Sequence, residues 1–85
     1  MGFEISKHAL EQMETRGISK STVQETLQNP QQTIFEDDYT VYQTIIKFDN
    51  KDYLIRVFLN EKVNPFKVIT VYKTSKIDKY YEGEI

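Results

Sequence analysis

The chain has 85 residues, of which 39% are hydrophobic and 28% are charged, and its formal net charge is −2. This composition predicts one folded domain over residues 1–85. The chain has no cysteine, which excludes disulfides and a thiolate nucleophile, and its single histidine cannot supply the ligands of a structural zinc site. No apolar run is long enough for a signal peptide or a membrane span, so we expect a cytoplasmic protein, away from membranes, with no metal and no cofactor.

Two short helices are expected in the first third of the chain. Ser6 can cap the first helix, and Gly17 would end it. Its apolar side is formed by Ala9, Leu10 and Met13. A second helix, capped by Ser19 or Ser21, would end before Pro30. Both helices are short, so each needs a sheet to pack on.

The rest of the chain, from Thr33 onward, is predicted to form three or four antiparallel strands. The segments rich in β-branched and aromatic residues are "TIFE", "YTVYQTIIKF", "DYLIRVFLN" and "FKVITVYKT". The turns between them are too short for crossover helices, so we predict a meander with both helices on one face. The predicted fold is α+β in the order ααββββ, and residues 81–85 are expected to form a flexible tail.

Alternation along the last two strands assigns their side chains to the two faces of the sheet. In the strand around Arg56, the odd-numbered residues from Tyr53 to Leu59 share the face opposite to Arg56. In the last strand, strict alternation separates Val68, Thr70 and Tyr72 from Lys67, Ile69, Val71 and Lys73. Both faces carry apolar residues, so the face without helices is predicted to be half open or to meet a partner.

A polar row follows one side of the first helix. His8, Gln12 and Arg16 are four residues apart and therefore lie in line between the apolar side and the solvated side. His8 is the only histidine, and a neutral imidazole can accept a proton near pH 7. Two interpretations stay open: the row performs chemistry, or it joins the helix to the sheet by hydrogen bonds.

A second group of candidates lies on the predicted strands. Arg56, Thr70 and Tyr72 combine a cation with hydroxyl groups, as a phosphate site requires, and Lys73 adds a further cation. Residues 45–85 carry eight Lys and Arg against six Asp and Glu, which favours contact with phosphate. The alternatives are that Thr70 and Tyr72 pack under the helices and that Lys73 is a solvated surface residue.

Three segments in this order resemble a known family: "SKHALEQMETRGIS", "VQETLQNP" and "VITVYKT". The family is catalogued as a domain of unknown function and is grouped with the RelE- and BrnT-like toxins; the resemblance covers residues 5–74. It implies the ααββββ fold shared with barnase, EndoU and colicin-type nucleases. It also implies a metal-independent endoribonuclease that is the toxin of a type II toxin–antitoxin system. The implied partners are an RNA substrate and a cognate antitoxin protein, and a homodimer is left open.

The resemblance also assigns roles to individual residues. His8 and Arg16 match the family's helix histidine and its "R-G-I" arginine, while Thr70 and Tyr72 match its last strand. In metal-free cleavage the substrate's own 2′-hydroxyl attacks, so the protein supplies a base, cations for the phosphate and a donor for the leaving oxygen. The expected catalytic residues are His8, Arg16, Arg56 and Tyr72, and the expected substrate contacts are Gln12, Thr70 and Lys73.

The alternative is a protein without this activity. An exposed apolar sheet face with aromatic strands suits a non-enzymatic interaction module, and an inactive protein with the toxin fold is a further alternative. In both cases His8 and Arg16 would only link the helix to the sheet. Arrest of growth on expression, lost in the His8→Ala or Arg16→Ala variant, would favour the toxin.

Overall fold

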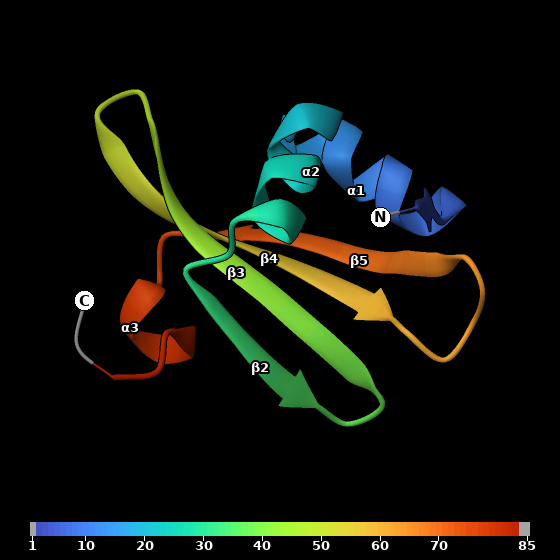
Figure 1. Cartoon of the computed structure of the whole chain (residues 1–85). Helices are drawn as coiled ribbons and strands as arrows, with labels where there is room; N and C mark the ends of the chain where they lie inside the picture. The colour runs from blue at the N-terminus through green and yellow to red at the C-terminus, as the bar shows by residue number, and fades with distance from the viewer. Residues whose placement is uncertain (1, 84–85) are drawn as a thin grey trace.

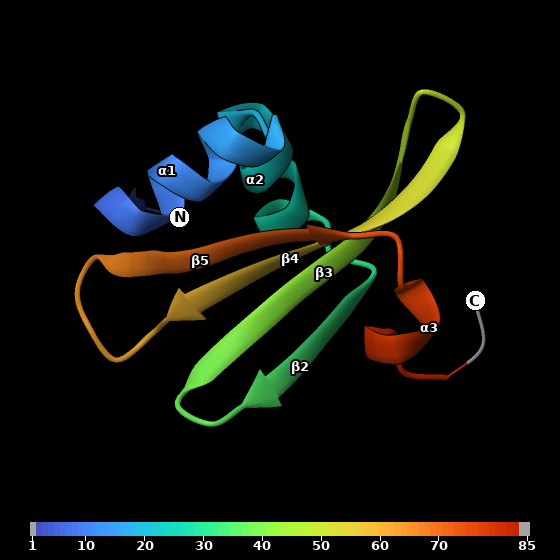
Figure 2. The same ribbon diagram turned by 180° about the vertical axis from the view of Figure 1, so that it is seen from behind.

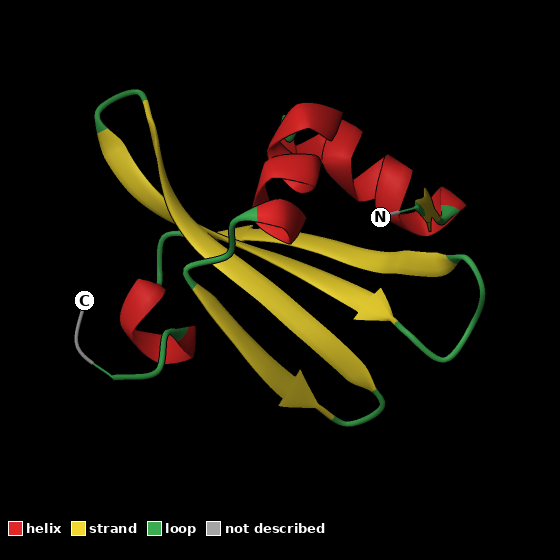
Figure 3. Cartoon of the chain, viewed as in Figure 1, coloured by secondary structure: helices red, strands yellow, loops and turns green. Residues whose placement is uncertain are grey.

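The computed structural model describes residues 2–83 and consists of one five-stranded sheet with helices on both of its faces (Figures 1 and 3). In chain order its elements are β1 (Phe3–Ile5), α1 (Lys7–Arg16), α2 (Lys20–Gln28), β2 (Gln32–Glu36), β3 (Tyr39–Phe48), β4 (Lys51–Asn60), β5 (Phe66–Thr74) and α3 (Ile77–Tyr80). The strand order is β1-β5-β4-β3-β2. Strands β2 to β5 pair antiparallel, and β1 pairs parallel with β5.

The α+β class is therefore confirmed, but the sheet is mixed and not the purely antiparallel meander that was predicted. The difference is β1, in which Phe3 pairs with Phe66 and Ile5 with Val68. A strand of three residues is too short for its alternation to be recognised, and its partner lies about sixty residues later in the chain. Only the folded chain brings the two segments together.

Local signals set the ends of the two main helices, as predicted. The Ser6 hydroxyl accepts a hydrogen bond from the Ala9 amide at 3.1 Å, and Gly17 ends α1 in the left-handed conformation with φ +65°. Of the two candidate caps for α2, Ser19 is the one used, because its hydroxyl accepts the Thr22 amide at 3.1 Å.

The Gly17→Ala variant is expected to lower the free energy of unfolding by about 1 kcal/mol, because a Cβ disfavours the left-handed conformation. A Cβ at Gly17 would meet no atom within 4 Å, so the loss comes from backbone conformation alone. Urea unfolding of the wild type and of Gly17→Ala measures it. Gly2→Ala is the control, since its Cβ also meets nothing and its φ is not positive; equal stability of both variants would contradict the prediction.

The hydrophobic core lies between the sheet and the α1–α2 pair, which cover the same face (Figures 1 and 2). Its buried members are Ala9, Met13, Ile18, Val23, Leu27, Ile55, Val57, Leu59, Val68 and Val71. The odd-numbered residues of β4 thus share one face, as alternation predicted, and the structure shows that this face is the one covered by α1 and α2. Leu10, predicted on the apolar side of α1, is 49% exposed.

A β-bulge in β5 changes which side chains share a face. Thr70 pairs with Phe58, but the next pair is Val68 with Leu59, so Ile69 is an extra residue in β5. Val68 and Val71 are therefore both buried in the core. The prediction that Val68 shares a face with Thr70 is wrong, because strict alternation fails across a bulge. Thr70 and Tyr72 pair with Phe58 and Arg56, and therefore lie on the second face of the sheet, opposite to α1 and α2.

Candidate functional site

The polar row of α1 lies along the edge of β5. Strand β1 covers only the beginning of this edge, and from Val68 onward the helix replaces it. The Ser6 amide donates to the Val68 carbonyl oxygen at 2.9 Å. Further along, the Gln12 side-chain oxygen accepts the Val71 amide, and Arg16 Nη1 donates to the Val71 carbonyl oxygen, both at 2.9 Å. Gln12 and Arg16 therefore do join the helix to the sheet.

Arg16 has a second contact that Gln12 lacks. Its guanidinium carbon lies 5.2 Å from the centre of the Tyr72 ring, within the range of a cation–π interaction. The Tyr72 side chain is on the second face, while Val71 beside it is in the core. Arg16 thus reaches round the edge of β5 and connects the α1 row to the second face.

His8 lies at the margin of this arrangement. Its side chain is exposed and lines a shallow hollow along α1 with Glu11, Gln12, Thr15 and Arg16. It precedes Arg16 by eight residues, which is about 12 Å along a helix. His8 therefore shares the α1 row with Arg16 but lies well along the helix from the arginine that contacts Tyr72.

A line of polar side chains crosses the second face of the sheet, and we call it the transverse row. Gln32, Gln43, Arg56 and Tyr72 are successive cross-strand partners on β2, β3, β4 and β5. Gln43 is fully buried and Arg56 is 4% exposed. No buried side-chain nitrogen or oxygen in residues 2–83 is without a hydrogen-bond partner, so the buried polar atoms of the row are all hydrogen-bonded.

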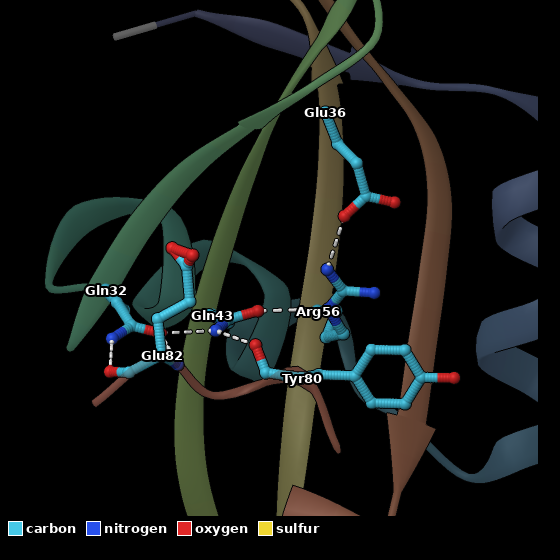
Figure 4. Close-up of polar contacts among 6 residues, drawn as sticks. All are labelled: Gln32, Glu36, Gln43, Arg56, Tyr80 and Glu82. Atoms are coloured by element: carbon cyan, nitrogen blue, oxygen red, sulfur yellow. Dashed lines mark hydrogen bonds and ion pairs between the residues drawn. The ribbon is translucent and has the colours of Figure 1, made fainter. Parts of the chain in front are cut away.

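Arg56 is the centre of the transverse row (Figure 4). Its Nε donates to Gln43 Oε1 at 3.0 Å, and its Nη2 donates to Glu36 Oε2 at 2.8 Å. Its guanidinium carbon lies 4.5 Å from the centre of the Tyr80 ring. Neighbouring side chains bury the guanidinium of Arg56, which was predicted to hold phosphate. Arg56 is instead placed to hold Tyr80 in position.

The segment that carries α3 lies across the transverse row. The Tyr80 carbonyl oxygen accepts Gln43 Nε2 at 3.2 Å. The Glu82 amide donates to Gln32 Oε1 at 3.0 Å, and Gln32 Nε2 donates back to the Glu82 carbonyl oxygen (Figure 4). The described part of the predicted flexible tail is therefore bonded to the sheet, and residues 84–85 lie outside the described residues.

Tyr80 contacts Arg56 directly, and Tyr72 contacts both Tyr80 and Arg16. The rings of Tyr72 and Tyr80 meet edge to face, with centroids 5.9 Å apart. The Tyr72 hydroxyl lowers the pKa of Tyr80, and the positive charges of Lys79 and Arg56 add to this effect. We call Arg16, Tyr72 and Tyr80 the edge cluster. It places one guanidinium and two phenol groups at the rim of the sheet.

The remaining predicted residues lie on different faces. Thr70 precedes Tyr72 by two residues on the second face and is half-buried beside the edge cluster. Lys73 is on the helix-side face, where its Nζ lies 4.6 Å from the centre of the Phe48 ring and 5.2 Å from that of Tyr53. The structure therefore brings Thr70 to the cluster and separates Lys73 from it.

Five residues of this site were not predicted: Gln32, Glu36, Gln43, Tyr80 and Glu82. A signal existed for Tyr80, because aromatic residues are rare in flexible segments and "KYYEG" holds two of them. Gln43 stands in a strand rich in aromatic and β-branched residues, which is typical of a buried hydrogen-bonded side chain. Within residues 2–83, no three His, Asp or Glu side chains are grouped so that they could hold a metal ion.

Comparison with known proteins gives one match. A family model described as "Domain of unknown function (DUF4258)" matches residues 5–73. Neither the curated proteins nor the solved structures gave a match. The matched span contains Arg16, Arg56 and Tyr72, while Tyr80 follows it. None of the helices in the described part of the chain is long and apolar enough to cross a membrane.

Proposed function

Since the chain belongs to the DUF4258 family, described as a domain of unknown function, we propose that it is a metal-independent endoribonuclease and the toxin of a type II toxin–antitoxin system. The observation that carries this proposal is the edge cluster. It combines a cation with two phenol groups at the rim of a sheet, and the pKa of Tyr80 is lowered. The resemblance to RelE- and BrnT-like toxins supports the same reaction, in the cytoplasm and under control of an antitoxin.

In the proposed reaction the 2′-hydroxyl of one nucleotide attacks the adjacent phosphorus, and the bond to the 5′ oxygen breaks. The products are a 2′,3′-cyclic phosphate and a 5′-hydroxyl. Arg16 stabilises the negative charge of the transition state, since only one of its five N–H groups is needed for Val71. The Tyr80 hydroxyl, next to Tyr72, protonates the leaving 5′ oxygen, and its lowered pKa makes it a stronger acid than a free tyrosine.

His8 is proposed as the base that removes the 2′-hydroxyl proton. It is exposed, and it lies on the same α1 row as Arg16, so RNA lying along this row would meet both side chains. Arg56 is proposed as a positioning residue, because its buried guanidinium packs against the Tyr80 ring. Thr70 is a substrate contact beside Tyr72.

The test is incubation of the purified protein with single-stranded RNA in EDTA, with analysis of the 3′ ends of the products. We expect cleavage that leaves 2′,3′-cyclic phosphates, strongly reduced in Arg16→Gln and retained in Lys20→Gln, which removes an exposed cation from α2. Expression of the wild type should stop bacterial growth, and expression of Arg16→Gln should not. Absence of cleavage by the wild type, or cleavage only with added metal, would refute the proposal.

A second candidate, the non-enzymatic interaction module, is favoured by the outer strand β2. Its residue Phe35 is 82% exposed at the edge of the sheet, beside the acidic turn at Asp37 and Asp38. An open strand edge with an exposed ring is typical of protein docking. If the wild type neither cleaves RNA nor stops growth, this candidate is preferred.

A further inference from the structure

The hairpin between β3 and β4 extends beyond the two helices that cover the core (Figures 1 and 2). On its helix-side face, two aromatic rings lie beside two lysines. We call these residues the hairpin patch: Phe48, Lys51, Tyr53 and Lys73. The first three belong to the hairpin itself, and Lys73 comes from the adjoining part of β5, where its strand partner is Ile55.

The four side chains of the hairpin patch contact one another. The Phe48 and Tyr53 rings meet edge to face, with centroids 5.9 Å apart. Lys73 Nζ lies over both rings, at 4.6 Å from the centre of Phe48 and 5.2 Å from the centre of Tyr53. Lys51 Nζ lies 5.7 Å from the centre of Tyr53. Two ammonium groups are therefore held against a pair of half-buried rings.

The negative charges of the hairpin lie mainly elsewhere. Asp52 pairs with Lys47 at 3.7 Å. These two residues are cross-strand partners, and alternation places both of them on the face opposite to Phe48 and Tyr53. Asp49 is in the turn. The hairpin patch thus presents two cations that no carboxylate of either strand faces.

We propose that the hairpin patch is a second binding site for single-stranded RNA, where a base stacks on an aromatic ring and phosphates contact Lys51 and Lys73. Interleaved rings and cations are what single-stranded nucleic acid requires, since every base has a face that can stack. An entering base takes the place of a lysine head group on the Tyr53 ring, and the flexible lysine moves to the phosphate. This inference rests on the proposed function, because it takes RNA as the ligand.

The position of Lys73 connects the patch with the edge cluster. Lys73 follows Tyr72 in β5, and the two side chains point to opposite faces of the same strand. The β1 strand pairs only with residues 66–68, so it does not cover this end of β5. The α1 side chains bond to this edge as far as Val71, and Lys73 lies two residues further along β5. An RNA strand that crosses the edge beyond Val71 can contact Tyr72 on one face and the hairpin patch on the other.

The test measures binding without cleavage, using a fluorescent twelve-nucleotide 2′-O-methyl RNA that has no attacking hydroxyl. The variant Tyr53→Leu is expected to bind it about tenfold more weakly, through loss of one stacked base. The double variant Lys51→Gln/Lys73→Gln should reduce the slope of log Kd against log salt by about 1.4, which corresponds to two phosphate contacts on a single strand. The matched control is Lys20→Gln/Lys67→Gln, which removes the same charge from other exposed positions and should keep the wild-type slope.

Each result separates the two proposals. Reduced binding and slope in the hairpin variants alone support the inference, even if the wild type proves unable to cleave RNA. If the hairpin variants keep the affinity and the salt slope of the wild type, the inference is refuted. In that case cleavage of RNA by the wild type would still support the proposed function. Equal weakening by the control double variant, stronger binding of duplex than of single strands, or no binding by the wild type would also refute the inference.

Discussion

The Arg56→Ala variant is expected to lose about 3 kcal/mol of unfolding free energy, since it removes the cation from a largely buried, hydrogen-bonded pair. The substitution leaves Gln43 Oε1 without its donor, in a position that is fully buried. It also removes the partner of Glu36 and the support beneath the Tyr80 ring. The Glu36 side chain is 48% exposed, so water can hydrate it after the substitution. We therefore expect a loss at the lower end of the range for broken buried ion pairs.

Thermal unfolding monitored by circular dichroism measures this loss. For a domain of this size, a loss of about 3 kcal/mol lowers Tm by about 12 to 24 °C. The control is Lys62→Ala, which breaks the 3.0 Å pair of Lys62 with Asp38 on an exposed surface. Such a pair contributes at most about 1 kcal/mol. A similar change of Tm in both variants would show that the transverse row does not stabilise the fold.

The Tyr80→Phe variant is expected to cleave RNA about 100-fold more slowly than the wild type, the lower end of the range for a general acid. Phenylalanine keeps the ring over Arg56 and removes only the hydroxyl. An acid acts in its protonated form, so the wild-type rate should fall as the pH rises through the lowered pKa of Tyr80. The variant should lack this decrease. The measurement is kcat/KM against pH in both proteins.

The neighbouring tyrosine supplies the control, since Tyr81→Phe removes a hydroxyl one residue away and should keep both the rate and its decrease at alkaline pH.

The stability of the protein gives an independent measurement. Because the pKa of Tyr80 is lowered in the folded protein, the unfolded chain binds more protons between that pKa and its ordinary value of 10.0. The free energy of unfolding of the wild type should therefore rise with pH in this range. Tyr80→Phe has no hydroxyl to titrate at this position, so its free energy of unfolding should lack this contribution. An unchanged cleavage profile in Tyr80→Phe would remove Tyr80 from the mechanism.

Helices α1 and α2 were predictable, but not α3, because the signals of the first two lie within a few residues of one another. The Ser6 hydroxyl bonds to the amide three residues later, and Gly17 takes a backbone conformation that few other residues adopt readily. The alternation of β4 was predictable for a similar reason, because a regular strand needs no information about its partners. The buried state of Val57 and its neighbours follows from that pattern.

The same reasoning failed where pairing between distant segments decides the structure. The bulge at Ile69 exists only in relation to β4, and it places Val68 in the core together with Val71. Tyr72 shares a face with Arg56 because the two residues are direct partners across β4 and β5. The sequence pattern selected Arg16, Arg56 and Tyr72 as site residues, and the structure connects them through Tyr80. The pattern could not distinguish an exposed arginine from one buried against Gln43 and Glu36, because that difference arises from three strands lying side by side.

The sequence by itself therefore determined the α+β class, the Ser6 cap of α1 and the polar row of α1, since each depends on residues close in the chain. The tertiary structure decided the parallel pairing of β1, the faces of β5 and the position of Tyr80. It also decided that Arg16 both joins α1 to β5 and contacts Tyr72, while His8 lies further along the helix. These features depend on contacts between residues that are far apart in the chain, as Phe3 and Phe66 are, and periodicity along the chain does not encode such contacts.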